Sequence, residues 1–253
     1  MSVTARSRSL LVPRPVARPR LRLVCLPHAG ASATMFVPWA GELPTDVELV
    51  AAQLPGRGAR RHEPAATRLG DLLDELREGL SPWLDAPVAL FGHSMGALLA
   101  FELARRLRGV AKIAWIVVSG HRAPHIPLRT APLHRLDDAQ LAEAIRGLGG
   151  TPDVLLRDAD LLRLLLPTLR ADFEAAETWT HRTDEVLDCP LLACAGLDDP
   201  HVTDEDLEGW RVHTRADFQC RRVRGDHFDV LAPGGPIVTE LARRAALGVG
   251  DPS

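Results

Sequence analysis

The stretch Val88-Ala-Leu-Phe-Gly92-His93-Ser94-Met95-Gly96-Ala97 decides the fold of this 253-residue chain. Its first four residues are typical of a buried strand, and the residues from Ala97 onward are typical of a helix, so the G-x-S-x-G pattern between them fits a sharp strand-turn-helix connection. A serine at the tip of such a turn is exposed, and the flanking glycines remove side chains that would collide with backbone. We therefore predict that Ser94 is a nucleophile. The alternative is an ordinary glycine-rich turn with a capping serine.

The rest of the chain repeats this alternation of apolar runs and amphipathic helices, which predicts an α/β fold with a mostly parallel central sheet and helices on both faces. One helix is indicated by a single stripe of leucines at positions 69, 72, 73, 76 and 80. The expected strands are Leu21 to Leu26, Val47 to Leu54, Val88 to Phe91, Ile113 to Val118, Leu191 to Ala195 and Phe218 to Val223.

The spacing of these elements suggests the domain organisation. We expect a flexible basic N-terminal arm over residues 1–20 and a single domain over residues 21–253. The segment between the strands at Ile113 and Leu191 is longer than a crossover helix and its loops require. It carries helix signals from Asp137 and from about Asp158 to Trp179, the second interrupted at Pro167. We interpret this insertion, at about residues 125–185, as a helical lid over the carboxyl edge of the sheet. The alternative is extra helical packing away from any site.

A serine nucleophile needs a base and an acid, and both can be assigned from chain order. In this arrangement the order is serine, acid, histidine, with the last two on loops after later strands. His227 follows the strand at Phe218 directly, so we predict that it is the base; the alternative is a surface-loop histidine. The strand ending at Ala195 leads into Asp198 and Asp199. We prefer Asp199 as the acid and keep Asp198 open.

The tetrahedral intermediate of such a reaction requires an oxyanion hole. The helix that begins after Ser94 directs free N–H groups toward the developing charge. The loop after the first strand of the domain supplies the second donor. We predict that the backbone N–H groups of Ala29 and Met95 form the pair, and that His28 is structural.

Composition excludes several classes of protein. A net charge of −3 and a pI of about 6.4 make nucleic acid an unsuitable partner. No apolar run is long enough for a membrane span or a signal peptide, so we expect a cytoplasmic protein that does not bind membranes. The four cysteines lack a C-x-x-C pair, and we interpret them as reduced core thiols. We expect no metal and no cofactor.

The motifs together resemble the type II thioesterases of polyketide synthase and nonribosomal peptide synthetase systems, which have an α/β-hydrolase fold. The resemblance implies hydrolysis of acyl thioesters from the phosphopantetheine arm of acyl or peptidyl carrier proteins, which clears stalled chains, and a mobile lid that forms an acyl chamber. It gives no role to the Leu-Pro-Gly-Arg-Gly loop, whose glycines and proline turn geometry explains. The matching segments are Leu26 to Gly30, Gln53 to Gly58 with Arg61 and Glu63-Pro64, Phe91 to Ala97, Ser119-Gly120 with Arg122-Ala123-Pro124, Asp198 to Pro200 and Gly225 to Phe228.

Three other interpretations stay open at this point. A carboxylesterase or lipase would use the same triad, because triad geometry does not distinguish sulfur from oxygen leaving groups. A non-catalytic carrier-binding protein could have kept the fold. An excised terminal thioesterase domain is a third possibility, although the initiator Met1 and the short tail favour a free-standing protein. We expect a monomer.

Overall fold

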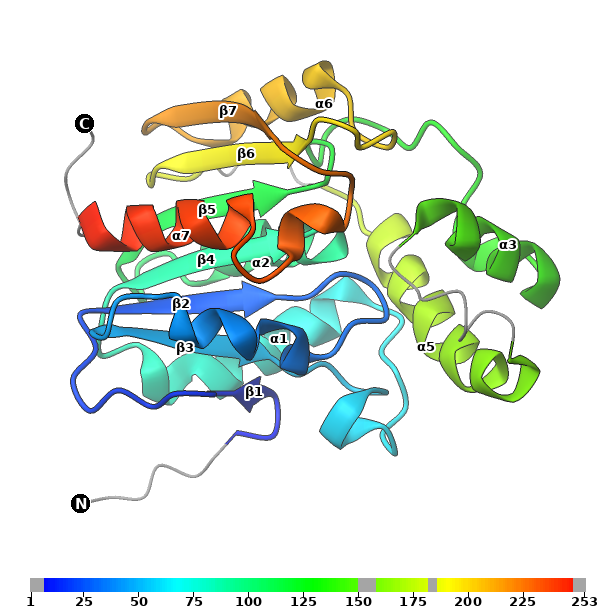
Figure 1. Ribbon diagram of the computed structural model, residues 1–253, viewed down its shortest axis with the longest axis horizontal. Helices are drawn as coiled ribbons and strands as arrows, with labels where there is room; N and C mark the ends of the chain where they lie inside the picture. Colours follow the sequence, from blue (N-terminus) through cyan, green and yellow to red (C-terminus); the bar gives the residue numbers. More distant parts are fainter. Residues whose placement is uncertain (1–6, 150–157, 182–185, 248–253) are drawn as a thin grey trace.

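The computed structural model describes residues 7–149, 158–181 and 186–247, which build one central sheet with helices around it (Figure 1). The strand order is β1-β3-β2-β4-β5-β6-β7, and every neighbouring pair is parallel except β1 with β3. This confirms the predicted α/β class. The strands are β1 (Leu10–Leu11), β2 (Leu21–Leu26), β3 (Val47–Ala52), β4 (Val88–His93), β5 (Ile113–Ser119), β6 (Leu191–Gly196) and β7 (Phe218–Val223).

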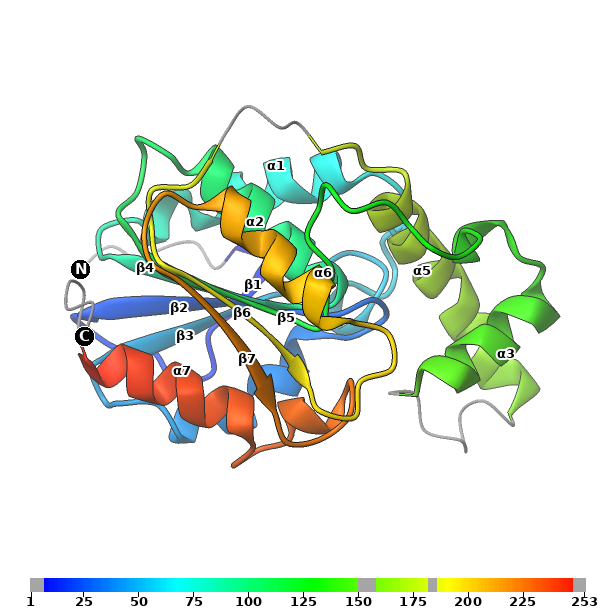
Figure 2. The same ribbon diagram turned by 90° about the horizontal axis from the view of Figure 1, so that it is seen from above.

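The middle strands are mostly apolar because helices cover both faces of the sheet. Helices α1 (Leu69–Leu80), α2 (Met95–Arg106) and α6 (Asp204–Glu208) lie on one face, and α7 (Pro236–Leu247) lies on the other (Figure 2). Each face has its own buried apolar cluster, one containing Phe101 and Trp210 and the other containing Phe36 and Trp39. Short 3-10 turns occur at Ala33–Phe36, Pro38–Gly41, Gly58–Arg60, Ser81–Trp83, Leu133–Arg135, Gly209–His213 and Asp229–Leu231.

The helix at residues 69–80 follows from its sequence period. All five leucines of the predicted stripe are buried against the sheet, as one apolar face at a 3.6-residue period requires. None of the helices in the described ranges combines the length and apolar character needed to cross a membrane. All four cysteines are free, three of them buried and Cys220 half-buried.

The described residues of the insertion form two helices beyond the carboxyl ends of the strands. They are α3 (Asp138–Leu148) and α5 (Ala159–Glu177), which lie beside each other and away from the sheet (Figures 1 and 2). Asp137 begins α3 with a capping box to Gln140, as its sequence signal indicated. Pro167 lies inside α5 and does not interrupt it, so that expectation was wrong. The parts of the predicted lid at residues 150–157 and 182–185 lie outside the described residues.

The N-terminal arm differs from its prediction. Leu10 and Leu11 form the antiparallel edge strand β1 on β3, and Ser9 is buried. The Arg14 guanidinium donates to the carbonyl of Pro44, and the Val16 N–H donates to Glu48. The described part of the arm is therefore fastened to the sheet rather than flexible. The sequence did not indicate this strand, because a strand of two residues is too short to show the alternation of apolar and polar residues.

Candidate active site

The turn at Ser94 has the strained geometry that the G-x-S-x-G pattern predicted. Ser94 has φ 54° and ψ −121°, and it is the only non-glycine residue with positive φ in the described chain. Its N–H donates to the carbonyl of Ser119 (2.8 Å), which fixes the tip of the turn to β5. A Cβ at Gly92 would overlap the Gly96 carbonyl, and one at Gly96 would overlap the Leu26 carbonyl. The sequence therefore needs glycine at both positions.

Two backbone N–H groups near Ser94 are free to act as an oxyanion hole. Met95 is the first residue of α2, so its N–H has no carbonyl one turn back in the helix. The Ala29 N–H makes no hydrogen bond to another described residue. Both residues line the cavity that contains Ser94. Ala29 and Met95 are the two residues whose N–H groups we predicted as the donors, and their role as an oxyanion hole stays a prediction.

An acid and a base face each other after β6 and β7. The His227 Nδ1–H donates to Asp199 Oδ2 (2.7 Å), and the Asp199 side chain is fully buried. The backbone N–H of His201 donates to the other oxygen, Oδ1 (2.9 Å). Both carboxylate oxygens are thus occupied, which holds the imidazole in one orientation. Asp198, the alternative acid, is exposed.

The charge state of Asp199 suits an orienting acid. Burial alone raises the pKa of this carboxyl, but the hydrogen bond and charge of His227 and the His201 N–H together lower its pKa below the usual value. The carboxylate is therefore ionised at neutral pH. An ionised carboxylate accepts a hydrogen bond from Nδ1–H, which leaves the Nε2 lone pair of the imidazole available as a base.

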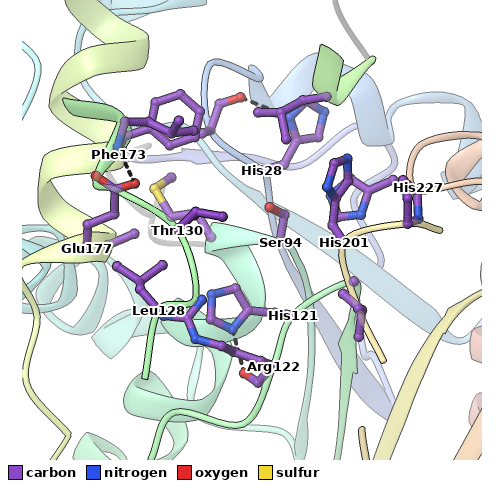
Figure 3. A pocket seen from close by; sticks show the side chains of 18 of the residues that line it. His28, Ser94, His121, Arg122, Leu128, Thr130, Phe173, Glu177, His201 and His227 are labelled. Carbon is purple, nitrogen blue, oxygen red and sulfur yellow. Dashed lines mark hydrogen bonds between the residues drawn. The ribbon is translucent and has the colours of Figure 1, made fainter. Parts of the chain in front are cut away.

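Ser94 and His227 line one cavity of about 450 Å³. Figure 3 shows the Ser94 hydroxyl pointing into this cavity, with His201 and His227 on one side and Phe173 and Glu177 of α5 across from them. In the described chain no hydrogen bond joins Ser94 Oγ to the imidazole. Contacts between nucleophile and base commonly tighten only when substrate is bound. The volume is in the range of small-ligand sites.

Gly120 lies against the predicted base His227, and sequence reasoning gave it no role. It follows β5 and has φ +62°, and a Cβ there would lie 2.5 Å from His93 Cε1 and 3.0 Å from His227 Cε1. Glycine therefore lets the His227 imidazole approach the sheet. The rings of His93 and His227 are in contact, with their centroids 4.7 Å apart. In the sequence, Ser119-Gly120 was only part of a matching motif. The one feature that could have indicated a role for Gly120 was a glycine directly after a strand.

The other histidines around the cavity are neutral. Burial, followed by the charge of His227, lowers the pKa of His93 well below its usual value. Burial likewise lowers the pKa of His28 and of His121 to about 4. The His28 Nδ1–H donates to the carbonyl of Ala29 (2.9 Å), which supports the structural role predicted for it. A cavity whose buried histidines are neutral leaves the positive charge to His227 when that residue takes a proton.

The insertion supplies the apolar wall of the cavity. A chamber of this kind suits a hydrocarbon chain better than a polar substrate. In the described parts of the chain, no group of three or more His, Cys, Asp or Glu side chains is arranged to hold a metal ion. The apolar lining residues from the insertion are Leu128, Leu133, Ile145, Leu148, Leu169, Phe173 and Ala176.

Comparison with known proteins adds a family to this geometry. A protein-family model described as thioesterase domain matches residues 21–245. The gramicidin S biosynthesis protein GrsT of Aneurinibacillus migulanus is 40% identical over 211 residues, which are 83% of this chain and 82% of that protein. The thioesterase PikA5 of Streptomyces venezuelae is 43% identical over 218 residues, covering 85% and 77% of the two chains. The solved type II thioesterase BorB from the borrelidin biosynthetic cluster superposes with a TM-score of 0.86 at 37% identity, covering 96% of this chain and 99% of the other.

The fold and the site therefore define an α/β-hydrolase, a hydrolytic enzyme with a serine elbow. The chain belongs to the thioesterase family, and within it to the type II thioesterases of polyketide and nonribosomal peptide biosynthesis. The resemblance inferred from the sequence motifs is confirmed.

Proposed function

We propose that this enzyme hydrolyses acyl groups from the phosphopantetheine thiol of acyl or peptidyl carrier proteins and so clears stalled chains, with Ser94, His227 and Asp199 as its triad. The observation that carries the proposal is the buried Asp199–His227 hydrogen bond of 2.7 Å at the rim of the cavity that holds Ser94. The apolar wall from α3 and α5 supports an acyl substrate. We further propose that the enzyme acts as a monomer.

The reaction has two halves that use the same groups. His227 Nε2 removes the Ser94 proton while Oγ attacks the thioester carbonyl, and the Ala29 and Met95 N–H groups donate to the oxyanion. The carbon–sulfur bond then breaks, and the imidazolium returns its proton to the leaving thiol. In the second half, His227 deprotonates a water that attacks the acyl-serine ester, and the proton returns to Ser94 Oγ. The products are the free carrier thiol and a carboxylic acid.

The chemistry is tested with Ser94→Ala. Loss of a triad nucleophile lowers kcat by about 10⁶-fold, while the fold should persist because alanine fits the space of serine. Steady-state hydrolysis of an acyl-carrier protein is the assay, with circular dichroism and thermal unfolding as checks of folding. A fluorophosphonate probe should label the wild-type enzyme at Ser94 and leave the variant unlabelled. Turnover by the variant at a rate near that of the wild type contradicts the assignment.

The substrate class needs a separate measurement. Paired thioester and oxyester substrates with the same acyl chain compare the two leaving groups directly, because the acyl chamber is then constant. We expect the carrier-bound thioester to be hydrolysed with the higher kcat/KM. A preference for the oxyester would assign the same triad to a carboxylesterase instead, and an unlabelled, inactive wild-type protein would favour a non-catalytic carrier-binding role.

A further inference from the structure

Arg57, in the Leu-Pro-Gly-Arg-Gly loop after β3, has a partner that turn geometry does not explain. Its guanidinium forms a bidentate ion pair with Asp172 of α5, with Nη1–Oδ2 2.5 Å and Nη2–Oδ1 2.7 Å. The two side chains are only 5% and 1% exposed. A paired fork of this kind is strong and directional. The loop is therefore joined to the insertion by a charge pair that lies away from solvent.

The same carboxylate also holds the loop after β2 that carries Ala29 and Gly30, which we call the oxyanion loop. Asp172 Oδ2 accepts the backbone N–H of Gly30 at 2.7 Å. Gly30 is the residue after Ala29, and the peptide between them belongs to the short turn in which the Ala31 N–H donates to the His28 carbonyl (3.1 Å). Fixing the Gly30 N–H fixes the plane of this peptide. The direction of the neighbouring Ala29 N–H depends on it.

One face of α5 contacts both loops. Thr168 Oγ1 donates to the carbonyl of Gly56 (3.0 Å), next to Arg57. Leu169 packs on Gly30, where a Cβ would lie 2.6 Å from Leu169 Cδ2. Residues 168, 169 and 172 share a side of the helix because they are separated by three or four positions. Glycine is favoured at position 30 chiefly because its φ is +78°.

From these contacts we infer that Asp172 and Arg57 are positioning residues of the oxyanion hole, an inference that rests on the proposed function of Ser94. Asp172 orients the loop that carries the Ala29 N–H, and the bidentate pair with Arg57 holds the Asp172 side chain in place. Without Arg57 the buried carboxylate would be an unpaired charge. Without Asp172 the Gly30 N–H would lose its acceptor, and Ala29 would no longer be aimed at the oxyanion.

The test compares Asp172→Asn, Arg57→Met and Arg57→Lys with a control pair elsewhere. Arg22 and Glu48 form another buried arginine–carboxylate pair (2.8 Å, side chains 8% and 3% exposed) near the starts of β2 and β3, at the opposite end of the sheet from the site. Arg22→Met therefore reports what the loss of any buried pair does to the fold. Each variant is assayed for kcat and KM on an acyl thioester below its unfolding temperature, and for its affinity for an alkylboronic acid. The boronate forms a tetrahedral adduct on serine and so needs the oxyanion hole.

We expect Asp172→Asn and Arg57→Met to lower kcat by about 10- to 100-fold, since removal of a whole oxyanion donor costs about 10²- to 10³-fold. Boronate affinity should fall in parallel while KM changes by less than about threefold, because the hole acts mainly on the transition state. Arg57→Lys keeps the charge without the fork and should recover part of kcat. Arg22→Met should lower the unfolding temperature and leave kcat within about twofold.

The inference is overturned if the folded Asp172 and Arg57 variants keep the kcat and boronate affinity of the wild type, or if their losses equal those of Arg22→Met. If Asp172→Asn and Arg57→Met fail to fold, the kcat and boronate affinity of Arg57→Lys decide the question. Fluorophosphonate labelling of the wild type at Ser94 is measured alongside. Its absence would refute the proposed function itself, whereas labelling with unaltered variants would refute only the positioning role.

Discussion

Replacement of Asp199 by asparagine gives a sharp test of the site, because the structure dictates how the amide would be oriented. The His201 N–H donates to Oδ1 (2.9 Å), so the amide oxygen of asparagine should occupy that position. The NH₂ group would then face His227 Nδ1, where Oδ2 now lies at 2.7 Å. A donor at this point favours the tautomer with its proton on Nε2, which cannot accept the proton of Ser94.

Two effects set the magnitude. The carboxylate stabilises the imidazolium formed in the transition state by about 4 kcal/mol, taking charges about 4 Å apart and an effective dielectric constant of about 20. That is about a 10³-fold change in rate at 1.36 kcal/mol for each factor of ten. The wrong tautomer adds to this loss, and the same substitution in a Ser-His-Asp triad lowers kcat by about 10⁴-fold. We therefore expect a fall of 10³- to 10⁴-fold for Asp199→Asn.

The assay follows thiol release from an acyl thioester, together with the rate of fluorophosphonate labelling, which should fall because it also needs an activated serine. Asp198→Asn is the matched control, since Asp198 is the adjacent aspartate and is exposed. It should keep kcat/KM within about twofold. The reasoning is refuted if Asp199→Asn keeps kcat/KM within tenfold of the wild type, or if Asp198→Asn loses as much activity.

Two further predictions concern stability. A Cβ at Gly92 would overlap the backbone carbonyl of Gly96, so Gly92→Ala should lower the free energy of unfolding by about 3 kcal/mol or more. In α3 nothing lies within 4 Å of a Cβ added at Gly147, so Gly147→Ala should raise the free energy of unfolding by about 0.5–1 kcal/mol. Denaturant unfolding measures both variants, and equal effects would contradict the reasoning. Burial, followed by the charges of His181, His125 and Arg105, lowers the pKa of His213 from 6.5 to about 3. Between these two pH values only the unfolded chain binds a proton at this residue. The free energy of unfolding should therefore fall by about 1.4 kcal/mol for each pH unit as the pH drops through this range. His213→Gln should make this slope shallower and the exposed His62→Gln should not, so unchanged slopes for His213→Gln in unfolding curves from pH 7 to pH 4 would contradict the assignment.

The sequence predicted best those features that rest on local periods and on chain order. The leucine stripe from residue 69 to residue 80 predicted a helix, and the structure has a helix over these residues, because apolar positions at a helical period indicate one buried face. The elbow was predictable because strand, turn and helix are contiguous there. Chain order pointed to His227 and to the Asp198-Asp199 pair without separating the two aspartates, and the structure brings His227 and Asp199 together. The edge strand β1 was missed because a pair of two residues leaves no periodic signal.

Contacts between distant segments could not be predicted in the same way. Arg57 and Asp172 are separated by 115 residues, and the chain has 33 acidic residues that could have paired with this arginine. The choice is made by the fold: β2 and β3 are neighbours and parallel, so the loops at their carboxyl ends emerge side by side, and α5 is the element of the insertion that lies against both. A carboxylate at position 172 then has three N–H donors within reach, and its own side chain is shielded from solvent. One structural unit is formed by the oxyanion loop, the Leu-Pro-Gly-Arg-Gly loop and the insertion. The sequence shows each of these parts but does not show that they contact one another.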